Sequence, residues 1–344
     1  MKQYFRERYL SELDQSGMVP LGTNKYVASE VYENFAPNDF DSDFGSWIID
    51  QQEQARERVR EMLAQCGCLA RFNRLAERHI EQQILPFVGA GMSKPSGFPM
   101  WGAFLKELAQ NDPHVLDKVK QAIEEGRFSD AAQIIADELD ENMLAEQIEN
   151  YFAANVFTPI GPVRLFPELF KLGCVTTNFD HVLEKVYEGN EQAFASVFSG
   201  TSIIEAPREA ASGENVLFKI HGTATSRLGR VLTTNEYNTA YGNQRTVPGT
   251  LNHLISNRSL LFMGCSLATD RTITAMQEIK AMNGAAGLRH YAFLADPGQA
   301  NRTAKHAELQ QAEIHPIWYP VVDQETDHNT WIENLLLALD GGPL

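Results

Sequence analysis

Four short polar clusters each follow an apolar run, and their side chains are of kinds that phosphate-binding and catalytic sites use. They are Gly89-Ala90-Gly91-Met92-Ser93, Thr177-Asn178-Phe179-Asp180, His221-Gly222 and Gly264-Cys265-Ser266. Glycines allow a backbone to approach a phosphate closely, while amide, carboxyl and imidazole groups hold hydroxyls and move protons. Together the clusters indicate a site for polar chemistry on a phosphorylated ligand.

Each cluster also has a simpler structural explanation. Short glycine turns are common, Asn178, Asp180 and Ser266 could each only cap the following helix, and His221 could be a buried core histidine. Four neighbouring side chains are expected to be structural: Lys219 as a solvated strand residue, Arg271 as an exposed surface arginine, and Trp101 and Phe104 as core residues. The functional interpretation therefore depends on the four clusters meeting in one place.

The elements that must position these clusters alternate between apolar strands and helices. Strands are predicted at 84–88, 173–176, 195–198, 216–220, 260–263 and 291–294, with a further one at 317–321. Helices are predicted at 101–110, 114–125, 129–140 (with Ser129 as its N-cap), 142–154, 180–187, 234–241, 248–257, 269–282, 298–312 and 331–339. This alternation predicts an α/β fold with a Rossmann-like, doubly wound, mainly parallel sheet. In such sheets ligands bind at the carboxyl ends of the strands, where all four clusters lie.

The sheet domain is expected to span residues 83–344, with a helical insertion at about 101–170. Residues 1–82 are predicted to form an N-terminal helical extension, because apolar residues recur at three- and four-residue steps from Trp47 to Gln82. Residues 34–45 are rich in Asp, Asn, Pro and Gly and are predicted to form a loop. The extension either docks on the main domain or another subunit, or only covers the sheet.

Composition excludes several classes of partner. The chain has 344 residues and a net charge of -16, which argues against a broad nucleic-acid or anionic-membrane surface but leaves room for a local basic patch. No apolar run approaches the ~20 residues of a membrane span, and the N-terminus shows no signal-peptide core, so a cytoplasmic location is predicted. The four cysteines form no C-x-x-C pair, so reduced thiols and no metal site are expected.

The four clusters, in this order, resemble the sirtuin superfamily over roughly residues 84–296. The pattern is most similar to bacterial sirtuin-like domains of anti-phage defence systems, many of which degrade NAD. The details that carry this similarity are Gly97-Phe98-Pro99-Met100-Trp101, Thr176-Thr177-Asn178-Phe179-Asp180, and Val231-Leu232-Thr233 with Glu236-Tyr237. Two features of protein-deacylating sirtuins are missing, because residues 223–263 contain no cysteines for a zinc module and Pro99 is not followed by Asp-Phe-Arg.

The resemblance implies that NAD is the substrate and that the bond between nicotinamide and ribose is cleaved. Asn178 would hold the ribose hydroxyls or the attacking water, Asp180 would orient the nicotinamide ribose or stabilise positive charge, and His221 would be the general base. The expected NAD-binding residues are Gly89, Ala90, Gly91 and Ser93 at the diphosphate, Gly264 and Ser266 at the adenosine half or its phosphate, Thr177, and Asp296 as a candidate for the adenine ribose.

The leading hypothesis is an NAD glycohydrolase that releases nicotinamide and ADP-ribose as an anti-phage effector. Regulation by homo-oligomerisation or by a partner, such as a ring-shaped translocase ATPase, is expected from the resemblance, without a membrane or direct nucleic-acid contact. Two alternatives remain open: an NAD-dependent deacylase or ADP-ribosyltransferase, and a non-enzymatic nucleotide-binding assembly module.

Overall fold

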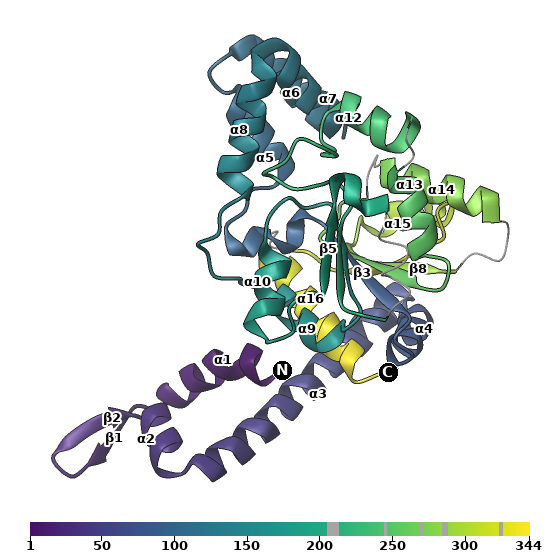
Figure 1. Cartoon of the computed structure of the whole chain (residues 1–344). Coiled ribbons are helices and arrows are strands. Elements are labelled where there is room, and N and C mark those ends of the chain that lie inside the picture. The colour runs from purple at the N-terminus through teal and green to yellow at the C-terminus, as the bar shows by residue number, and fades with distance from the viewer. Residues whose placement is uncertain (205–212, 244–245, 268–270, 284–287, 323–325) are drawn as a thin grey trace.

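A computed structural model describes residues 1–204, 213–243, 246–267, 271–283, 288–322 and 326–344. Its centre is a parallel sheet of seven strands in the order β5-β6-β4-β3-β7-β8-β9, with helices on both faces (Figure 1). The strands are β3 (Ile84–Val88), β4 (Gly173–Thr176), β5 (Ser196–Ser199), β6 (Val216–Lys219), β7 (Ser259–Met263), β8 (His290–Ala295) and β9 (Ile314–Tyr319). The predicted Rossmann-like α/β fold is confirmed, although β9 begins three residues earlier than expected.

The sheet reverses its winding at β3. This strand pairs with β4 on one side, where Val88 lies opposite Thr176, and with β7 on the other, where Val88 lies opposite Met263. Thr176 in turn lies opposite Lys219 at the end of β6. The four polar clusters begin one or two residues after these four paired positions, so the register brings them to a single edge of the sheet. That edge is the switch point where doubly wound sheets bind ligands.

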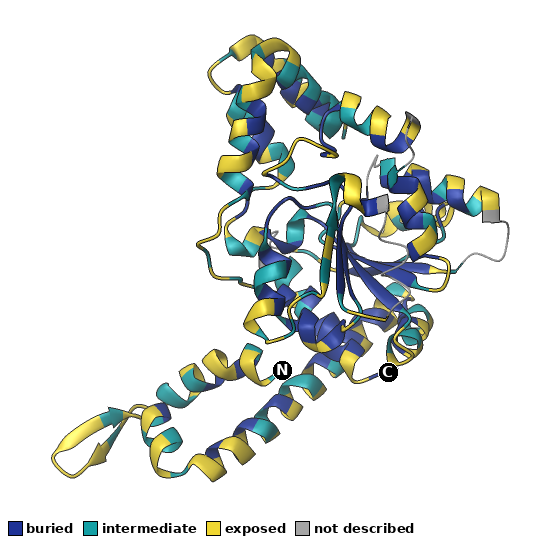
Figure 2. Ribbon diagram, in the orientation of Figure 1, coloured by how far each residue is buried: buried dark blue, intermediate teal, exposed yellow. Residues whose placement is uncertain are grey.

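The central strands are buried on both faces, as Figure 2 shows. The helices that follow β3 stack above its carboxyl end: α5 (Trp101–Ala109), α6 (Pro113–Glu124), α7 (Phe128–Ile135) and α8 (Glu141–Phe152). Their apolar residues occupy one face, as with Val115, Val119 and Ala122 of α6. The expected N-cap is wrong, because Arg127 precedes α7 and Ser129 lies inside its first turn.

The later helices flank the sheet and close the domain. They are α9 (Phe166–Leu169), α10 (Val182–Gly189), α12 (Thr234–Tyr237), α13 (Thr246–Leu254), α14 (Arg271–Asn283), α15 (Gln299–Gln310) and α16 (Thr326–Asp340). Helix α12 continues into a π-helical segment, Asn238–Asn243. Such segments are rare and occur frequently at functional sites.

The N-terminal region forms an arm that projects from the sheet domain (Figure 1). The arm comprises α1 (Lys2–Asp14), a hairpin of β1 (Met18–Leu21) and β2 (Asn24–Val27) that was not predicted, α2 (Ala28–Phe35) and the first half of α3 (Pro37–Cys66). Helix α4 (Leu69–Ile80) follows and lies against the sheet domain. The second half of α3 docks on the domain, since Arg56 donates to the carbonyl oxygens of Ala338 and Gly342 at 3.1 and 3.0 Å.

The predicted loop at 34–45 is wrong, because α3 begins at Pro37. A proline at the first helical position and Asp39 in the first turn both favour a helix start. Phe40 and Phe44 are buried against Tyr9 of α1, with the rings of Phe44 and Tyr9 stacked at 4.9 Å. Tertiary packing of these aromatic rings thus stabilises a helix in a stretch whose composition is typical of loops.

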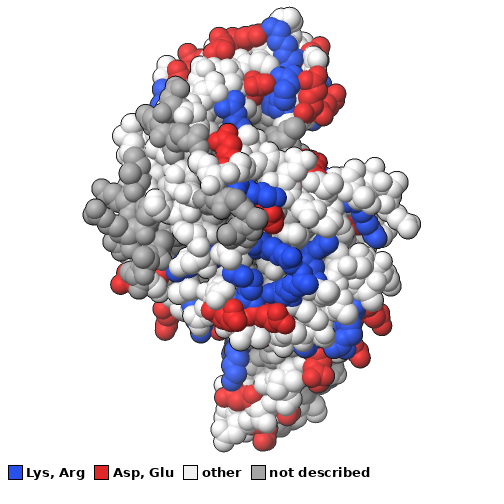
Figure 3. Space-filling view, turned by 90° about the vertical axis from the view of Figure 1, so that its right-hand side faces the viewer, with Lys and Arg blue, Asp and Glu red and all other residues white. Residues whose placement is uncertain are grey.

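Charge is distributed unevenly over the surface. Figure 3 shows Lys and Arg gathered in the middle of the face that lies at the right of Figure 1, above a row of acidic side chains. Burial raises the pKa of Tyr291 on β8, and the nearby charges of Arg78 and Arg74 from α4 and of Arg289 act in the opposite direction. A local basic patch therefore exists on a chain whose net charge is -16. Among the described residues, no helix combines the length and apolar character needed to cross a membrane.

Candidate functional site

Two cavities adjoin at the carboxyl edge of the sheet, on either side of the segment Gly264–Ser266. The first has a volume of about 730 Å³ and the second about 980 Å³. Both are lined by Met100 and by Gly264, Cys265 and Ser266, which makes the loop after β7 the wall between them. Each is of the size that small-molecule sites have.

The glycine turn after β3 packs against this dividing loop. The N–H of Gly89 donates to Met263 O at 2.9 Å, and that of Gly91 donates to Gly264 O at 3.0 Å. A Cβ at Gly89 would lie 2.5 Å from Gly264 O, and one at Gly91 would lie 2.9 Å from Gly264 Cα. The two glycines are therefore needed for close packing of β3 and β7, whereas the sequence interpretation assigned them to phosphate approach.

The turn nevertheless borders both cavities. Gly89 and Ala90 line the first cavity, and Gly91 lines the second. Two short 3₁₀ segments, Ala90–Met92 and Lys94–Ser96, lie between the turn and the helix predicted at 101–110, which is α5. The helix N-terminus that borders the first cavity is that of α5, through Met100 to Ala103.

Replacing Gly264 with alanine is expected to destabilise the fold. Gly264 has a φ of +67°, and an added Cβ would lie 2.6 Å from the backbone nitrogen of Met92. The left-handed backbone costs about 1–2 kcal/mol for alanine, and the clash adds about 1–3 kcal/mol. Gly97→Ala is the matched control, because Gly97 has a φ of +95° and a Cβ added there would have no atom within 4 Å. Equal falls in the midpoint of urea unfolding for the two variants would contradict the packing role.

The loop Thr177–Asp180 after β4 is fixed by hydrogen bonds from neighbouring elements. Asn178 Nδ2 donates to Ser93 Oγ at 3.0 Å, and the Asn178 N–H donates to Thr176 Oγ1 at 3.0 Å. Asn178 is 4 % exposed, and its Oδ1 is a buried acceptor without a partner in the described part of the chain. Thr177 lines the first cavity, so this open acceptor lies one residue from its wall.

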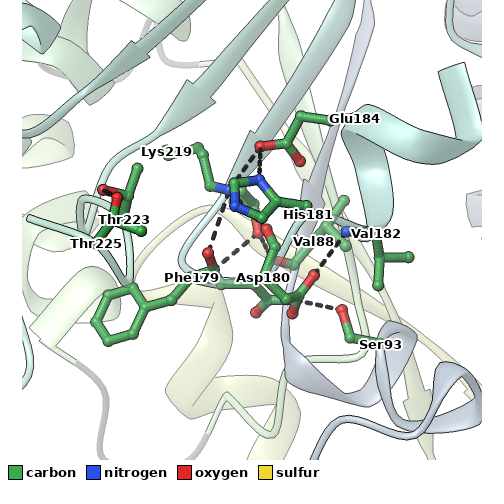
Figure 4. Close-up of polar contacts among 12 residues, drawn as sticks. Val88, Ser93, Phe179, Asp180, His181, Val182, Glu184, Lys219, Thr223 and Thr225 are labelled. Atoms are coloured by element: carbon green, nitrogen blue, oxygen red, sulfur yellow. Dashed lines mark hydrogen bonds and ion pairs between the residues drawn. The ribbon is translucent and has the colours of Figure 1, made fainter. Parts of the chain in front are cut away.

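Asp180 is buried in the same loop. Its Oδ1 accepts the N–H of Val182, the first residue of α10, at 3.0 Å, and the Ser93 hydroxyl also hydrogen-bonds its carboxylate. Burial raises the pKa of Asp180 above its ordinary value. Asp180 thus bonds the first N–H of α10 from the position before its N-cap, His181, and also links the loop to the glycine turn through Ser93 (Figure 4).

Lys219 is fully buried at 1 % exposure, so the expectation that it is solvated is wrong. Figure 4 shows its ammonium pointing toward the loop after β4. Nζ donates to Asp180 O at 2.6 Å, to Phe179 O at 3.4 Å and to Glu184 Oε1 at 2.7 Å. His181 Nδ1 lies 3.2 Å from the same Glu184 oxygen. Since β6 lies inside a parallel sheet covered on both faces, a lysine there must be paired, and this pair holds the loop in place.

His221 follows β6 and lines the first cavity together with Thr177 and Trp101. Burial lowers the pKa of His221 to about 3, so the imidazole is neutral at physiological pH. Its Nε2 lies 2.7 Å from the hydroxyl of Tyr241. A neutral imidazole can accept a proton, which an imidazolium cannot.

The stability of the fold is expected to fall as pH drops from about 6.5 to 3. Burial lowers the pKa values of His221 and His290 to about 3, so in this range the unfolded chain binds protons that the folded chain does not. Each histidine should lower the free energy of unfolding by about 2 kcal/mol between pH 6.5 and 5.

Urea unfolding at pH 7.5 and pH 5 tests this dependence. His290 Nδ1 accepts the N–H of Leu260 at 3.0 Å, and the Oδ1 of His290→Asn can replace that acceptor without titrating. We expect the free energy of unfolding of this variant to fall by about 2 kcal/mol less than that of the wild type between pH 7.5 and pH 5. His114 is exposed, so His114→Asn serves as the control. If it diminished the acid-induced fall in unfolding free energy as much as His290→Asn does, the attribution of that fall to buried His290 would be contradicted.

The structure brings most of the predicted site residues to the two cavities. Those that line them are Gly89, Ala90, Gly91, Thr177, His221, Gly264 and Ser266. Ser93, Asn178 and Asp180 form the buried layer behind this lining. Asp296 lies between Ala295 and Pro297, which line the second cavity, but its own carboxylate binds Arg302 at 2.7 and 2.5 Å and accepts the Gly298 N–H. The Arg302 hydrogen bond lowers the pKa of Asp296.

Sequence reasoning missed several residues that line the first cavity. Lys106, Arg127 and Tyr237 are examples, and Arg271, expected to be an exposed surface residue, lines it as well. Arg271 donates to Asn238 Oδ1 at 2.7 Å, with its Cζ 5.4 Å from the ring centre of Tyr237. Charged residues at isolated helical positions carry no pattern, so only the Glu236-Tyr237 pair could have indicated this wall. Phe104 is a core residue as expected, whereas Trp101 both packs on Phe179 at 5.1 Å and lines the cavity.

Part of the chain is similar in sequence to known proteins. Residues 173–317 match the SIR2-like domain family. The chain is also 25% identical over 216 residues to a protein named NAD(+) hydrolase ThsA from Cytobacillus dafuensis. That alignment covers 62% of this chain but only 41% of the relative, so the chain spans less than half of the relative's length. Residues 173–317 are therefore SIR2-like, and the predicted resemblance to sirtuin-like proteins is confirmed.

Proposed function

We propose that the chain hydrolyses NAD to nicotinamide and ADP-ribose. The observation that carries this proposal is a neutral, buried His221 in the wall of one cavity, which adjoins a second cavity at the switch point of the sheet. Together the cavities offer space for the two halves of a dinucleotide. The relative named as an NAD(+) hydrolase supports the same substrate.

The residues that line the two cavities suit different parts of NAD. The first cavity carries the cationic side chains Lys106, Arg127 and Arg271, which suit a diphosphate and the adjoining nicotinamide ribose. Phe293, Trp318 and Ile332 line the second cavity and offer apolar surface to an adenine ring. The dividing loop, Gly264–Ser266, would then lie beside the diphosphate.

In the proposed reaction, a water oxygen forms a bond to C1′ of the nicotinamide ribose as the bond from C1′ to the nicotinamide nitrogen breaks. The electron pair of the broken bond stays on nicotinamide, which leaves as a neutral molecule, and His221 accepts the proton released from water. The open Oδ1 of Asn178 would accept a hydrogen bond from the water or a ribose hydroxyl. Asp180 bonds Ser93 and Val182 and so keeps this loop in place. Its carboxylate would also stabilise the positive charge that develops on the ribose.

We further propose that this activity serves anti-phage defence and is controlled by assembly with a second copy or a partner protein. The projecting arm supports an assembly role, because it exposes the large apolar residues Phe35 (73 %), Ile49 (58 %) and Met18 (54 %). This part of the proposal is independent of the chemistry at His221.

The test is release of nicotinamide from NAD by the purified chain, followed by chromatography. The measurement is made on the chain alone and on the chain co-expressed with the products of neighbouring genes. We expect equal amounts of nicotinamide and ADP-ribose in at least one condition. NAD loss that requires an acylated peptide would favour a deacylase or transferase. Tight NAD binding without turnover in both conditions would contradict hydrolysis and favour a binding module.

A further inference from the structure

A hydrogen-bonded series of three side chains begins with His221 in the wall of the first cavity and runs through Tyr241 to Thr272. His221 Nε2 and the Tyr241 hydroxyl are 2.7 Å apart, and the Tyr241 hydroxyl is 3.1 Å from Thr272 Oγ1. All three side chains are buried, with exposures of 6 %, 8 % and 1 %. Bulk water is thus kept from these hydrogen bonds, which makes their donor and acceptor roles specific.

Three separate elements position this series. His221 follows β6, Tyr241 lies in the π-helical segment Asn238–Asn243, and Thr272 lies in the first turn of α14. The ring of Tyr237 lies edge-on to the imidazole at 5.2 Å and stacks with the ring of Tyr241 at 5.3 Å. The N–H of Val231 donates to His221 O at 2.9 Å and fixes the backbone of the histidine. The imidazole is therefore held both at its ring and at its backbone.

The contact with Tyr241 occupies Nε2, so only Nδ1 remains for a proton from the reaction. A neutral imidazole carries one proton, and the nitrogen that lacks it is the base. Nδ1 is that base only when Nε2–H donates to the Tyr241 oxygen. The Tyr241 O–H can then donate to Thr272 Oγ1, so that His221 donates to Tyr241 and Tyr241 donates to Thr272.

We propose that Tyr241, supported by Thr272, is a positioning residue that holds His221 as the tautomer with its proton on Nε2. This inference deepens the proposed function and rests on its assignment of His221 as the base. Tyr241 touches the imidazole and not the reacting atoms, so it acts through His221. Its removal should therefore lower kcat while leaving KM close to that of the wild type.

Two readouts test the proposal on the full chain. Long-range ¹H–¹⁵N correlation spectra of histidine-labelled protein report which ring nitrogen carries the proton, with the His221 signal assigned by its loss in His221→Gln. We expect protonated Nε2 and bare Nδ1 in the wild type, and a mixture of tautomers in Tyr241→Phe. Nicotinamide release by Tyr241→Phe should show kcat reduced roughly tenfold, the effect of one hydrogen bond.

Thr272→Val provides a second variant in case Tyr241→Phe does not fold, because it keeps the phenol and removes the hydroxyl that the Tyr241 oxygen contacts at 3.1 Å. We expect a smaller shift of the tautomer in the same direction. Tyr237→Phe is the control for the spectrum and should leave the tautomer unchanged. A wild-type His221 with its proton on Nδ1, or a tautomer unaffected by Tyr241→Phe, would overturn the inference. Absence of NAD cleavage by the wild type would instead count against the proposed function, and the spectra would still decide the role of Tyr241.

Discussion

Replacing His221 with alanine is expected to reduce nicotinamide release by about two to four orders of magnitude, the usual contribution of a general base. The imidazole lines the first cavity, and burial lowers its pKa to about 3, so the wild-type base is unprotonated over the whole physiological range. The measurement is kcat/KM for NAD under the condition in which the wild type is active.

His221→Gln separates loss of the base from loss of packing. Glutamine retains polar atoms that can hydrogen-bond Tyr241 but cannot accept a proton near neutral pH. We expect His221→Gln to lose as much activity as His221→Ala while unfolding at a urea concentration closer to that of the wild type. The exposed His114→Ala should keep full activity. More than a tenth of wild-type activity in His221→Gln would exclude the base role.

The pH profile offers an independent check on the same residue. An ordinary histidine would lose activity as pH falls through about 6.5, whereas His221 should not become protonated until well below pH 5. We therefore expect no loss of kcat/KM attributable to a histidine between pH 8 and 5. A decline centred near pH 6.5 would mean that an exposed, unperturbed imidazole acts in the reaction in place of the buried one.

The central strands of the seven-stranded sheet and their polar ends were predictable because each of these strands is a short, nearly continuous apolar run. The register of a parallel sheet then brings the ends of β3, β4, β6 and β7 to one edge. The packing role of Gly89 and Gly91 was not predictable, since a glycine that admits a phosphate and one that admits another strand look alike in sequence. The structure shows that role by the 2.5 Å approach of Gly264 O to the Cβ position of Gly89.

Other features depend on contacts between distant parts of the chain. Asp296 follows strand β8 as a ribose-binding acid would, but Arg302, in the first turns of α15, binds its carboxylate. Tyr241 lies 20 residues after His221, and its π-helical segment has no recognised sequence pattern. The burial of Lys219 could have been recognised from the sequence, because it lies in the apolar run of β6 and a central parallel strand has no solvated face. Its partner, Glu184, is 35 residues away and could not be identified from spacing.

Lys219→Met is expected to lower the free energy of unfolding by about 3–5 kcal/mol, because it leaves the Glu184 carboxylate buried without its cation. The loop carrying Asn178 also loses the hydrogen bonds from Nζ to Phe179 O and Asp180 O. Nicotinamide release should therefore fall together with stability. Lys118→Met is the control: Lys118 forms an equally short ion pair with Glu138 at 2.6 Å, but on the surface, where removal should cost less than about 1 kcal/mol.

The pH dependence of the loss identifies its cause. Burial acts to raise the pKa of Glu184, but the hydrogen bond from His181 and the charge of Lys219 outweigh it and hold that pKa below its ordinary value. A depressed carboxylate pKa stabilises the fold above the unfolded pKa, and this contribution is lost as pH falls. Without Lys219, burial should raise the pKa of Glu184, so acidification protonates the unpaired group and relieves the penalty. We therefore expect the difference in unfolding free energy between wild type and Lys219→Met to shrink between pH 7.5 and 4.5.

The double variant Lys219→Met, Glu184→Gln tests whether the unpaired charge of Glu184 causes the loss of stability. Its amide is neutral, so no unpaired charge remains buried, and it can still bond His181. We expect it to recover at least half of the stability lost by Lys219→Met at pH 7.5, measured by the midpoint of urea unfolding. Recovery of stability without recovery of nicotinamide release would show that the Nζ contacts with the loop carbonyl oxygens position Asn178 separately from their effect on folding. A double variant no more stable than the single one, with a loss that does not vary with pH, would mean that the Lys219 stem contributes by packing and that the buried ion pair does not.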